Sequence, residues 1–347
     1  MDINPLAEDL DKIVENTHNL WSDLRSQRIF ITGGTGFFGR WLLESLIWAN
    51  DKYELGVEVL VLTRDLEAFE KKAPHLIAHS AVQCHIGDVR SFAFPQGSFS
   101  HVIHAATEAS AKLNHADPLL MLDTIVQGTR QTLEFARNCE ARKFLLTSSG
   151  AVYGKQPTDL THISEDYLGA PDTMDARSAY GEGKRMAELL CSIYAQQYGI
   201  ETKIARCFAF VGPHLPLDGD FAIGNFIRDG IKGYQIRVNG DGTPYRSYLY
   251  AADLAIWLWT ILVKGKACHP YNVGSDQEIS IIDLAYTVSR VFNLRSETLT
   301  GKKPTPGKCA ERYIPSINRA ISELNLKPIT ALEESISRTA SVITRQV

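Results

Sequence analysis

Three side chains have the types and the spacing that proton transfer requires. Tyr180 and Lys184 are four residues apart, and Ser149 ends an apolar run further up the chain. In a helix, residues i and i+4 lie on one face, so the lysine ammonium can lie beside the phenol. A neighbouring cation lowers the pKa of a tyrosine, which is ordinarily about 10. We therefore predict that Tyr180 exchanges a proton with a substrate hydroxyl, that Lys184 stabilises the tyrosinate, and that Ser149 bridges substrate and phenol.

A glycine-rich segment directly follows the apolar residues 28–32. Glycines three residues apart between a strand and a helix allow a tight turn, close approach of a pyrophosphate and close packing of the helix on the strand. The helix N-terminus also offers free amide groups to phosphates. We expect this segment to hold a dinucleotide, NAD or NADP, through Gly33, Thr35, Gly36, Phe37, Phe38 and Gly39. Either motif alone could be structural, but together they predict hydride transfer at a carbon that bears a hydroxyl.

The end of the second apolar run bears on the choice between NAD and NADP. A carboxylate there would accept a hydrogen bond from the ribose 2′-hydroxyl of NAD. Thr63 occupies that place, and Arg64 follows it. An arginine can pair with the 2′-phosphate of NADP. Asp65 could instead be a displaced ribose ligand, and Arg64 a solvated charge, so the sequence favours NADP only slightly.

Two further loops are expected to line the cofactor. The apolar runs at 82–86 and 101–105 are each followed by small or polar residues. Ligands of parallel sheets bind at the carboxyl ends of the strands, where such loops lie. Ordinary strand-end loops would look the same. The residues that we expect in contact with the cofactor are Asp88, Val89, Ala105, Ala106 and Thr107, together with Tyr180 and Lys184 at the nicotinamide ribose.

The elements that must position these residues follow from the pattern of apolar runs. Strands are expected at residues 29–32, 57–63, 82–86, 101–105, 143–147 and 202–207. Helical patterns are expected at residues 37–49, 119–138 and 178–198. Strands that alternate with helices predict an α/β fold with a Rossmann-type, doubly wound parallel sheet.

The chain is expected to have three parts. Residues 1–27 carry apolar side chains at helical spacing and predict an amphipathic helical extension, which docks on its own subunit or on a partner. Residues 28–207 form the expected Rossmann NAD(P)-binding domain. Residues 208–347 are richer in Gly, Pro and aromatic residues and predict a smaller α+β substrate-binding region, from which residues 248–275 return to the Rossmann domain.

Composition excludes several classes of protein. The chain of 347 residues is 44% hydrophobic and carries a net charge of −4, which favours neither nucleic acid nor an anionic membrane as partner. No apolar run is long enough to span a bilayer, and no signal pattern opens the chain. Six scattered cysteines indicate reduced thiols in a cytoplasmic protein. His75 and His79 lack a third ligand, so no metal site is expected.

The motifs resemble those of the extended short-chain dehydrogenase/reductase family, and within it the nucleotide-sugar epimerases and dehydratases. The resemblance covers residues 28–340. Besides the glycine segment, Tyr180 and Lys184, it rests on Gly87-Asp88-Val89, Ser148-Ser149-Gly150-Ala151-Val152-Tyr153-Gly154, Gly212-Pro213, Gly240-Asp241-Gly242 leading to Arg246, and Tyr271-Asn272-Val273-Gly274. Residues 177–185 look especially like UDP-glucuronate decarboxylases.

The resemblance implies a nucleoside-diphosphate sugar as substrate and hydride transfer at C4 or a neighbouring carbon. It implies that Arg246 and Arg312 contact the diphosphate, which two guanidinium groups suit. Substrate contacts are also expected from Ser148, Ser149 and Asn225. The resemblance further implies a homodimer through the helices at 119–138 and 178–198.

The chain departs from this family at four places. The dehydratases carry Asp and Glu after the catalytic hydroxyl residue, where this chain has Gly150 and Ala151, and the decarboxylases carry Glu at the place of Ala151. Glu165 or Asp166 could substitute. Two family asparagines are replaced by Ala209 and Ile125, so the phosphate pocket can be rearranged.

Three hypotheses follow. The leading one is an NAD(P)-dependent nucleotide-sugar epimerase or 4-ketoreductase, since neither needs the missing carboxylates. The second is a 4,6-dehydratase or a decarboxylase-like lyase. The third is a cofactor-binding protein without catalysis, against which the joint presence of Ser149, Tyr180 and Lys184 argues.

Overall fold

A seven-stranded parallel sheet forms the centre of the fold. The computed structural model describes residues 4–107, 111–219, 221–295, 298–307 and 309–345. The strand order is β11-β6-β5-β4-β1-β2-β3, and every pairing is parallel. The strands are β1 (Arg28–Thr32), β2 (Glu58–Thr63), β3 (Val82–Ile86), β4 (His101–His104), β5 (Lys143–Ser149), β6 (Glu201–Cys207) and β11 (Pro270–Val273).

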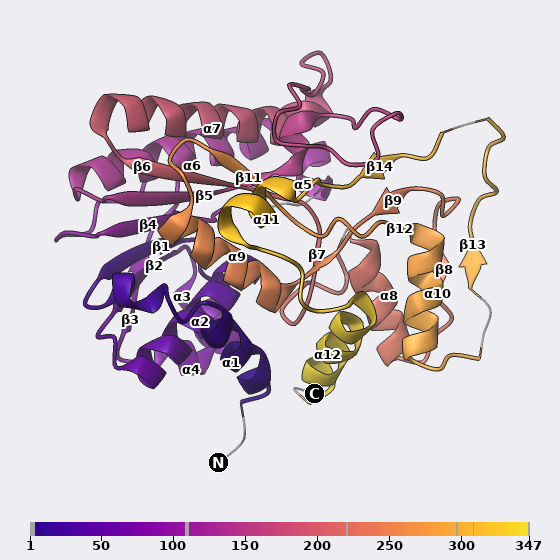
Figure 1. Cartoon of the computed structure of the whole chain (residues 1–347), viewed down its shortest axis with the longest axis horizontal. Coiled ribbons are helices and arrows are strands. Elements are labelled where there is room, and N and C mark those ends of the chain that lie inside the picture. The colour runs from indigo at the N-terminus through magenta and orange to yellow at the C-terminus, as the bar shows by residue number, and fades with distance from the viewer. Residues whose placement is uncertain (1–3, 108–110, 220, 296–297, 308, 346–347) are drawn as a thin grey trace.

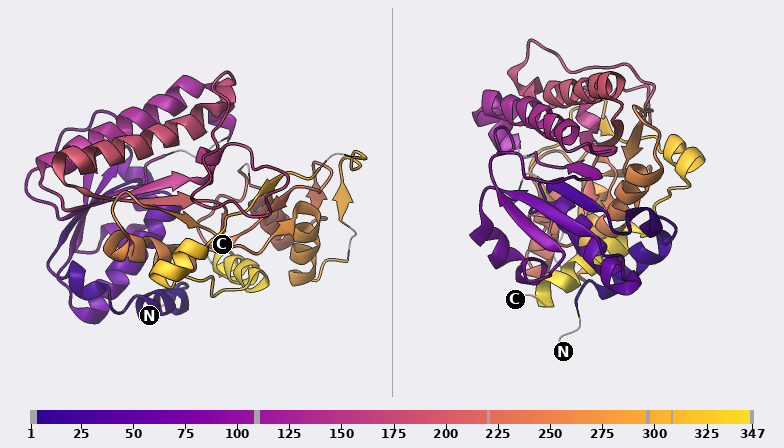
Figure 2. Two further views of the ribbon diagram at one scale, coloured as in Figure 1. Left: turned by 45° about the horizontal axis from the view of Figure 1, so that its top comes forward. Right: turned by 90° about the vertical axis from the view of Figure 1, so that its left-hand side faces the viewer.

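Helices cover both faces of this sheet, as Figure 1 shows. Successive side chains of a strand point to opposite faces. Ile29 and Ile31 therefore enter one core with α2 (Phe37–Tyr53) and α9 (Ala251–Lys264), whereas Phe30 enters the other with α6 (Pro118–Asn138) and α7 (Ala179–Tyr198). Figure 2 shows α6 and α7 side by side along one face. This arrangement confirms the predicted Rossmann-type fold.

The N-terminal segment packs on the face that α2 and α9 cover. It forms α1 (Ala7–Asn16) and a 3-10 turn, η1 (Trp21–Leu24), rather than one continuous helix. Thr17 ends α1, and its Oγ1 donates to the Ile13 carbonyl at 2.5 Å. Polar residues such as Thr and Asn are weak helix formers, which explains the break. The apolar residues of the segment are nevertheless buried: Leu6, Leu10, Ile13, Val14, Leu20, Trp21 and Leu24.

The second half of the chain builds a smaller region and also returns to the sheet. Its helices α8 (Ala222–Ile231), α10 (Ile281–Val291) and α12 (Leu332–Arg345) share an apolar core. Its short strands are β7 (Phe210–Val211), β8 (Arg237–Val238), β9 (Tyr245–Arg246), β10 (Leu249–Tyr250), β12 (Ile279–Ser280), β13 (Leu299–Thr300) and β14 (Arg312–Tyr313). In the same half of the chain, α9 packs on the main sheet and β11 pairs with β6 at the edge of that sheet.

Short elements connect these layers. They are α3 (Leu66–Lys72), α4 (Pro74–Ile77), α5 (Ala111–Ala116), η2 (Gly150–Tyr153), η3 (Ala176–Ser178) and α11 (Asn318–Leu324). Within the described ranges, none of the helices combines the length and the apolar character needed to cross a bilayer.

Candidate active site

The glycine turn joins β1 to α2 and is shaped by close backbone contacts. Gly33 has a positive φ of 73°, and a Cβ there would lie 2.5 Å from the carbonyl of Ala105. A Cβ on Gly39 would lie 2.2 Å from the Gly33 carbonyl oxygen. Gly36 differs, because the nearest atom to its Cβ position is 3.5 Å away. Gly33 and Gly39 are therefore required by the close approach of backbone atoms, whereas Gly36 leaves an open surface.

The first turn of α2 is suited to an anion. Gly36 is its N-cap, so no side chain caps the leading amide groups of the helix. Phe37 and Phe38 follow, and the Phe38 ring meets Phe210 edge to face at 5.1 Å. The turn, with half-buried Thr35, thus lies where the sheet meets the smaller region. These residues fit the pyrophosphate of a dinucleotide, which needs close backbone approach and free amide groups.

The end of β2 leaves Arg64 exposed beside this turn. Thr63 is buried and its Oγ1 donates to the Asp65 carbonyl at 3.1 Å. The Asp65 carboxylate caps α3 by accepting from the Ala68 amide at 2.9 Å. Asp65 is therefore committed to a helix cap, which leaves Arg64 as the charged group at this strand end.

The ends of β3 and β4 hold the other expected cofactor residues. The Asp88 carboxylate accepts two bonds from the Arg90 guanidinium, at 2.8 and 3.0 Å, and these bonds lower the pKa of Asp88. The Val89 side chain packs in the core against Gly128. Ala105 and Ala106 lie directly after β4, where both amides donate to Thr32.

Lys184 of α7 is buried against the ends of β4 and β5. Its Nζ donates to Thr107 Oγ1 at 2.9 Å and to the Thr147 carbonyl at 2.8 Å. Burial lowers the pKa of Lys184 to about 8. Its Nζ also lies 5.9 Å from the centre of the Tyr180 ring. The structure thus brings the expected residues Thr107, Tyr180 and Lys184 to one place.

Tyr180 and Ser149 meet at the end of β5. Burial raises the pKa of Tyr180 to about 12, and a hydrogen bond with Ser149 opposes this rise. Ser149 Oγ also accepts from the Ala151 amide at 3.1 Å. The prediction that Lys184 lowers the pKa of Tyr180 is wrong in this structure, because desolvation dominates and the ammonium is bonded elsewhere. The phenol is protonated at neutral pH.

Both expected diphosphate ligands line one cavity of about 510 Å³. Arg246 lies on β9 and donates to the Tyr245 carbonyl at 2.8 Å. Arg312 lies on β14, which pairs with β9, and its guanidinium stacks 4.5 Å over the Tyr245 ring and pairs with Glu278. The two guanidinium groups thus belong to neighbouring strands at a single cavity, as a doubly charged ligand requires.

The sequence pattern of the NAD dependent epimerase/dehydratase family matches residues 29–274. The chain belongs to this family. A UDP-glucuronic acid decarboxylase 1 of Arabidopsis thaliana is 33% identical over 315 residues, which are 90% of this chain and 69% of the relative. The UDP-glucose 4-epimerase of Thermus thermophilus, solved with NAD, is 25% identical with a TM-score of 0.75 and covers 92% of this chain and 100% of its own. A dTDP-glucose 4,6-dehydratase of Streptomyces venezuelae has a TM-score of 0.78 at 22% identity, over 92% and 97% of the two chains.

In this epimerase/dehydratase family member, the side chains of Ser148 and Ser149 have different surroundings. The Ser148 Oγ donates to Glu188 Oε1 at 2.5 Å, and Glu188 forms a half-buried ion pair with Arg206. Neighbouring residues of a strand point to opposite faces, so only one of the two serines can face the cavity. In this structure the Ser148 hydroxyl holds α7 to β5, and its contact with substrate stays a prediction.

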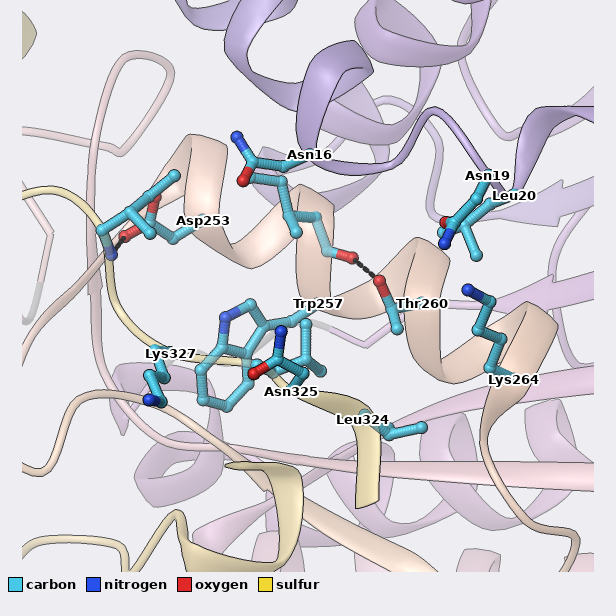
Figure 3. Close-up of a pocket in the computed structure, with 13 residues that line it drawn as sticks. Asn16, Asn19, Leu20, Asp253, Trp257, Thr260, Lys264, Leu324, Asn325 and Lys327 are labelled. Atoms are coloured by element: carbon cyan, nitrogen blue, oxygen red, sulfur yellow. Dashed lines mark hydrogen bonds between the residues drawn. The ribbon is translucent and has the colours of Figure 1, made fainter. Parts of the chain in front are cut away.

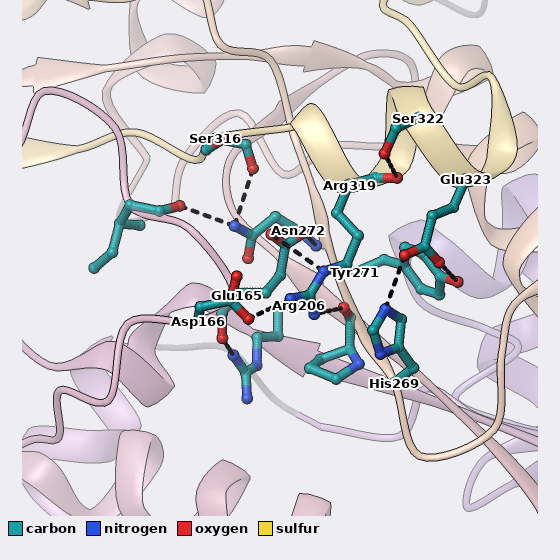
Figure 4. A network of polar contacts seen from close by, with 12 residues as sticks. Glu165, Asp166, Arg206, His269, Tyr271, Asn272, Ser316, Arg319, Ser322 and Glu323 are labelled. Carbon is teal, nitrogen blue, oxygen red and sulfur yellow. Dashed lines mark hydrogen bonds and ion pairs between the residues drawn. The ribbon is translucent and has the colours of Figure 1, made fainter.

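Glu165 and Asp166, the acids that could substitute for those the family carries after the hydroxyl residue, have other partners in this structure. Glu165 accepts from the Asn272 amide at 2.8 Å, and Asp166 pairs with Arg319 at 2.5 Å. Figure 4 shows both in a network with Arg206 that ties β6 and β11 to α11. Burial raises the pKa of Glu165. Their role in this structure is to join elements, away from the contacts of Ser149.

Asn225 is also engaged away from the cavity. It donates to the carbonyls of Gly219 and Phe221 at 3.0 and 3.2 Å and accepts from Arg228 at 3.0 Å. Its amide therefore fixes the entrance to α8 in this structure, and its contact with substrate stays a prediction.

Sequence reasoning missed Tyr313. This residue shares the cavity with Arg246 and Arg312, and its ring packs on Phe208 with centroids 4.7 Å apart. The only signal was an aromatic residue next to the suspected Arg312. Its hydroxyl reaches the Ser149 region because Gly150 has no side chain.

A second cavity, of about 410 Å³, lies between the N-terminal segment, α9 and the residues after α11 (Figure 3). Asn16, Trp257 and Lys264 are among its lining residues. It contains none of the expected site residues, and α9 covers the sheet face opposite to α7. It is therefore separate from the candidate active site.

Proposed function

We propose that this protein transfers hydride at a ring carbon of a nucleoside-diphosphate sugar, at C4, as an NAD(P)-dependent epimerase or ketoreductase. Ser149, Tyr180 and Lys184 supply the proton-transfer groups. Among the described residues, the hydrogen-bond partners found for these three side chains include no carboxylate. Hydride exchange needs none, whereas elimination of water requires an acid and a base.

The lack of room at Gly150 favours hydride exchange over elimination of water. A Cβ at Gly150 would lie 2.7 Å from the Tyr313 hydroxyl oxygen and 2.8 Å from the Phe208 ring, so the position directly after Ser149 has no room for an acid. The next position, Ala151, has only a methyl group. Of the two positions directly after Ser149, the first thus has no room for an acidic side chain and the second carries an apolar one.

The cofactor, when bound, supplies or accepts the hydride. The glycine turn and the leading amides of α2 would bind its pyrophosphate. Arg64 favours the 2′-phosphate of NADP, although the relatives solved with cofactor hold NAD. Lys184 would hold the nicotinamide ribose, and residues 28–207 would act as the cofactor domain.

The sugar nucleotide would lie between the cofactor and the smaller region, residues 208–347. Arg246 and Arg312 would pair with its diphosphate. Ser149 would hold the reacting oxygen, and Tyr180 would give it a proton on reduction or accept one on oxidation. Because the Tyr180 phenol is protonated at neutral pH, the resting site is set for proton donation.

The two residues that replace the family asparagines fit a rearranged pocket. Ile125 packs between α6 and α7, and the Ala209 carbonyl accepts a hydrogen bond from the Leu249 amide.

The second candidate is a lyase, either a 4,6-dehydratase or a decarboxylase. It is favoured by identities of about one third to UDP-glucuronic acid decarboxylases over 90% of the chain. It would require an acid from outside the positions after Ser149. A cofactor-binding protein without catalysis would not need the arrangement of Ser149, Tyr180 and Lys184.

We propose a homodimer through α6 and α7. The α7 residues Met186, Leu189 and Ile193, spaced three and four apart, form an exposed apolar stripe, and Leu119 of α6 is 72% exposed. Such a stripe is more typical of an interface than of a free surface.

We also propose a cytoplasmic location, since all six cysteines, each within the described residues, are free thiols.

The first experiment is mass spectrometry of small molecules released by denaturing the purified protein. Stoichiometric NAD⁺ or NADP⁺ would indicate a cofactor recycled in each turnover, which favours an epimerase. Release of none, with binding of added NADPH, would indicate a ketoreductase. A protein that neither contains nor binds either dinucleotide would contradict the proposal.

A Tyr180→Phe variant then tests the chemistry. We expect turnover to fall by about 10²–10⁴-fold while cofactor binding is unchanged, because only the proton-transfer group is lost. Retained turnover would refute the role of Tyr180.

A further inference from the structure

The second cavity, of about 410 Å³, is built by three segments that are far apart in the sequence (Figure 3). One wall is α9, another is the end of α1 with the residues that follow it, and the third is residues 324–329, which run from the end of α11 toward α12. Two of these walls lie outside residues 29–274, the part of the chain that matches the family pattern. Cavities of about 300–1,000 Å³ are typical of small-molecule sites, so this one has room for a ligand.

The only carboxylate among the described lining residues, that of Asp253, is used to fix a wall. It accepts from the Ile329 amide at 2.9 Å, and from the amide and the hydroxyl of Thr330, both at 3.1 Å. Asp253 is buried, and these donors come from the segment that leads into α12. The cavity is therefore held in shape before a ligand arrives, and its one acid is already engaged.

Two lysines at the rim are available to an anion. Lys264 ends α9 and Lys327 belongs to the third wall, and both are exposed. In the part of the chain that the structure describes, neither ammonium group has an ion-pair partner. Glu323, the acid just before the third wall, pairs instead with Lys266 and His269. Figure 3 shows the two rim lysines toward opposite ends of the cavity, so each end offers a cation.

Carboxamide groups lie between these cations. Figure 3 shows Asn16 and Asn325 between the two lysines, and Asn19 toward the Lys264 end. Asn16 donates to the Lys12 carbonyl at 2.8 Å, which leaves its amide oxygen. Within the described ranges, the side chains of Asn19 and Asn325 have no hydrogen bond. A carboxamide both donates and accepts, which suits hydroxyl groups.

The floor of the cavity is apolar. Three of the lining residues are buried there: Leu20, Trp257 and Leu326. Apolar side chains of this kind pack against the C–H groups of a ligand, while a few polar groups at the rim fix its orientation. The lining thus combines a cation at each end, amides in the middle and an apolar base.

We propose that this cavity is a second ligand site, which binds a small polyol with a phosphate group at each end, such as a hexose bisphosphate. Lys264 and Lys327 pair with the two phosphates, since an ammonium group on a flexible stem suits a phosphate as a point charge. The asparagine amides bond to the hydroxyl groups, and the floor packs against the carbon chain. The site is separate from the cavity of Arg246 and does not depend on the proposed function.

Calorimetric titration of the purified protein with fructose 1,6-bisphosphate tests this proposal, with inorganic phosphate and fructose as further probes. We expect saturable binding of the bisphosphate at one site per chain and at least about tenfold weaker binding of the other two probes, because neither can pair with both lysines. Lys264→Gln and Lys327→Gln should each weaken binding of the bisphosphate by about tenfold or more, through loss of a charge-assisted contact. Both variants should keep the melting temperature of the wild type, because the side chains are exposed.

Two further variants serve as controls. Lys72→Gln removes an exposed cation at the end of α3, and Arg246→Gln alters the other cavity, so both should bind the bisphosphate as the wild type does. Losses confined to Lys264→Gln and Lys327→Gln support the proposal. Equal losses in Lys72→Gln would mean attraction by surface charge alone, and a loss in Arg246→Gln would assign the probe to the other cavity. Either result overturns the proposal, as does a wild-type protein that fails to bind the bisphosphate or binds inorganic phosphate equally well.

Discussion

Lys184 on α7 and Thr107 after β4 are joined by a hydrogen bond of 2.9 Å from Nζ to Oγ1. This bond ties the helix that carries Tyr180 to the strand end where a dinucleotide would lie. It also gives the buried ammonium a side-chain acceptor besides the Thr147 carbonyl. The position and the charge of Lys184 therefore both depend on Thr107.

A Thr107→Val variant should lower the pKa of Lys184 below about 8, because the charged form loses an acceptor and burial already disfavours it. Activity that needs the ammonium should then decline at a lower pH than in the wild type, with a loss of about tenfold near pH 8. The pH profile of turnover measures this. Thr107→Ser keeps the hydroxyl and serves as the matched control. Coincident profiles of the Val and Ser variants would show that the bond is irrelevant.

Two glycines of the turn should respond differently to alanine. Gly33→Ala forces a Cβ to within 2.5 Å of backbone at a positive φ, so it should destabilise the fold by about 1–3 kcal/mol or more. Gly36→Ala meets nothing closer than 3.5 Å and should leave the melting temperature unchanged. It should nevertheless weaken NAD(P)H binding by about tenfold or more, because the methyl group covers the surface that a pyrophosphate must approach. Unweakened binding by Gly36→Ala would remove the turn from the cofactor site.

Arg64 should set the cofactor preference. Arg64→Ala should weaken NADPH binding by about tenfold or more and change NADH binding little, because only NADPH carries the 2′-phosphate. Lys72→Ala, an exposed cation at the end of α3, is the matched control. Fluorescence titrations with the two dinucleotides measure both affinities. Equal losses for NADH and NADPH would mean that Arg64 does not contact the phosphate.

Stability should fall as the pH falls below about 6.5, partly through His104. His104 is buried between Thr32 and Thr129, and burial lowers its pKa to about 3. Its folded pKa lies below the unfolded value, so its contribution is complete above the unfolded pKa and is lost as the pH falls toward the folded pKa. His101 and His214 act in the same direction, whereas Asp253, with a pKa raised to about 6, opposes them.

Urea unfolding at several pH values tests this. Between about pH 6 and about pH 4, His104→Gln should reduce the slope of the unfolding free energy against pH by about 1.4 kcal/mol per pH unit. The reason is that the variant takes up one proton fewer than the wild type when it unfolds. A slope equal to that of the wild type would show that His104 does not titrate as proposed.

The sequence predicted the sheet and the approach of Ser149, Tyr180, Lys184 and Thr107, because strand and helix periodicities alone bring these elements to one edge. It did not reveal Tyr313, since β14 has only two residues and pairs with a strand far away in the chain. Burial around Tyr180 depends on tertiary packing, which the sequence pattern does not show. The sequence therefore predicted a lowered pKa for Tyr180, whereas burial raises it. The separation of the Ser148 and Ser149 side chains follows from the sequence, because successive side chains of a strand point to opposite faces.

We propose that the sugar is altered by hydride transfer without loss of water or carbon dioxide. Mass spectrometry of the products, after incubation with a panel of UDP-sugars and UDP-glucuronate in the presence of NAD(P)⁺ or NAD(P)H, tests it most directly. We predict a product of unchanged mass, an epimer, or one that gains two hydrogens from a keto sugar, formed by the wild type and not by Tyr180→Phe. A product that has lost water or carbon dioxide would contradict the claim and establish a lyase.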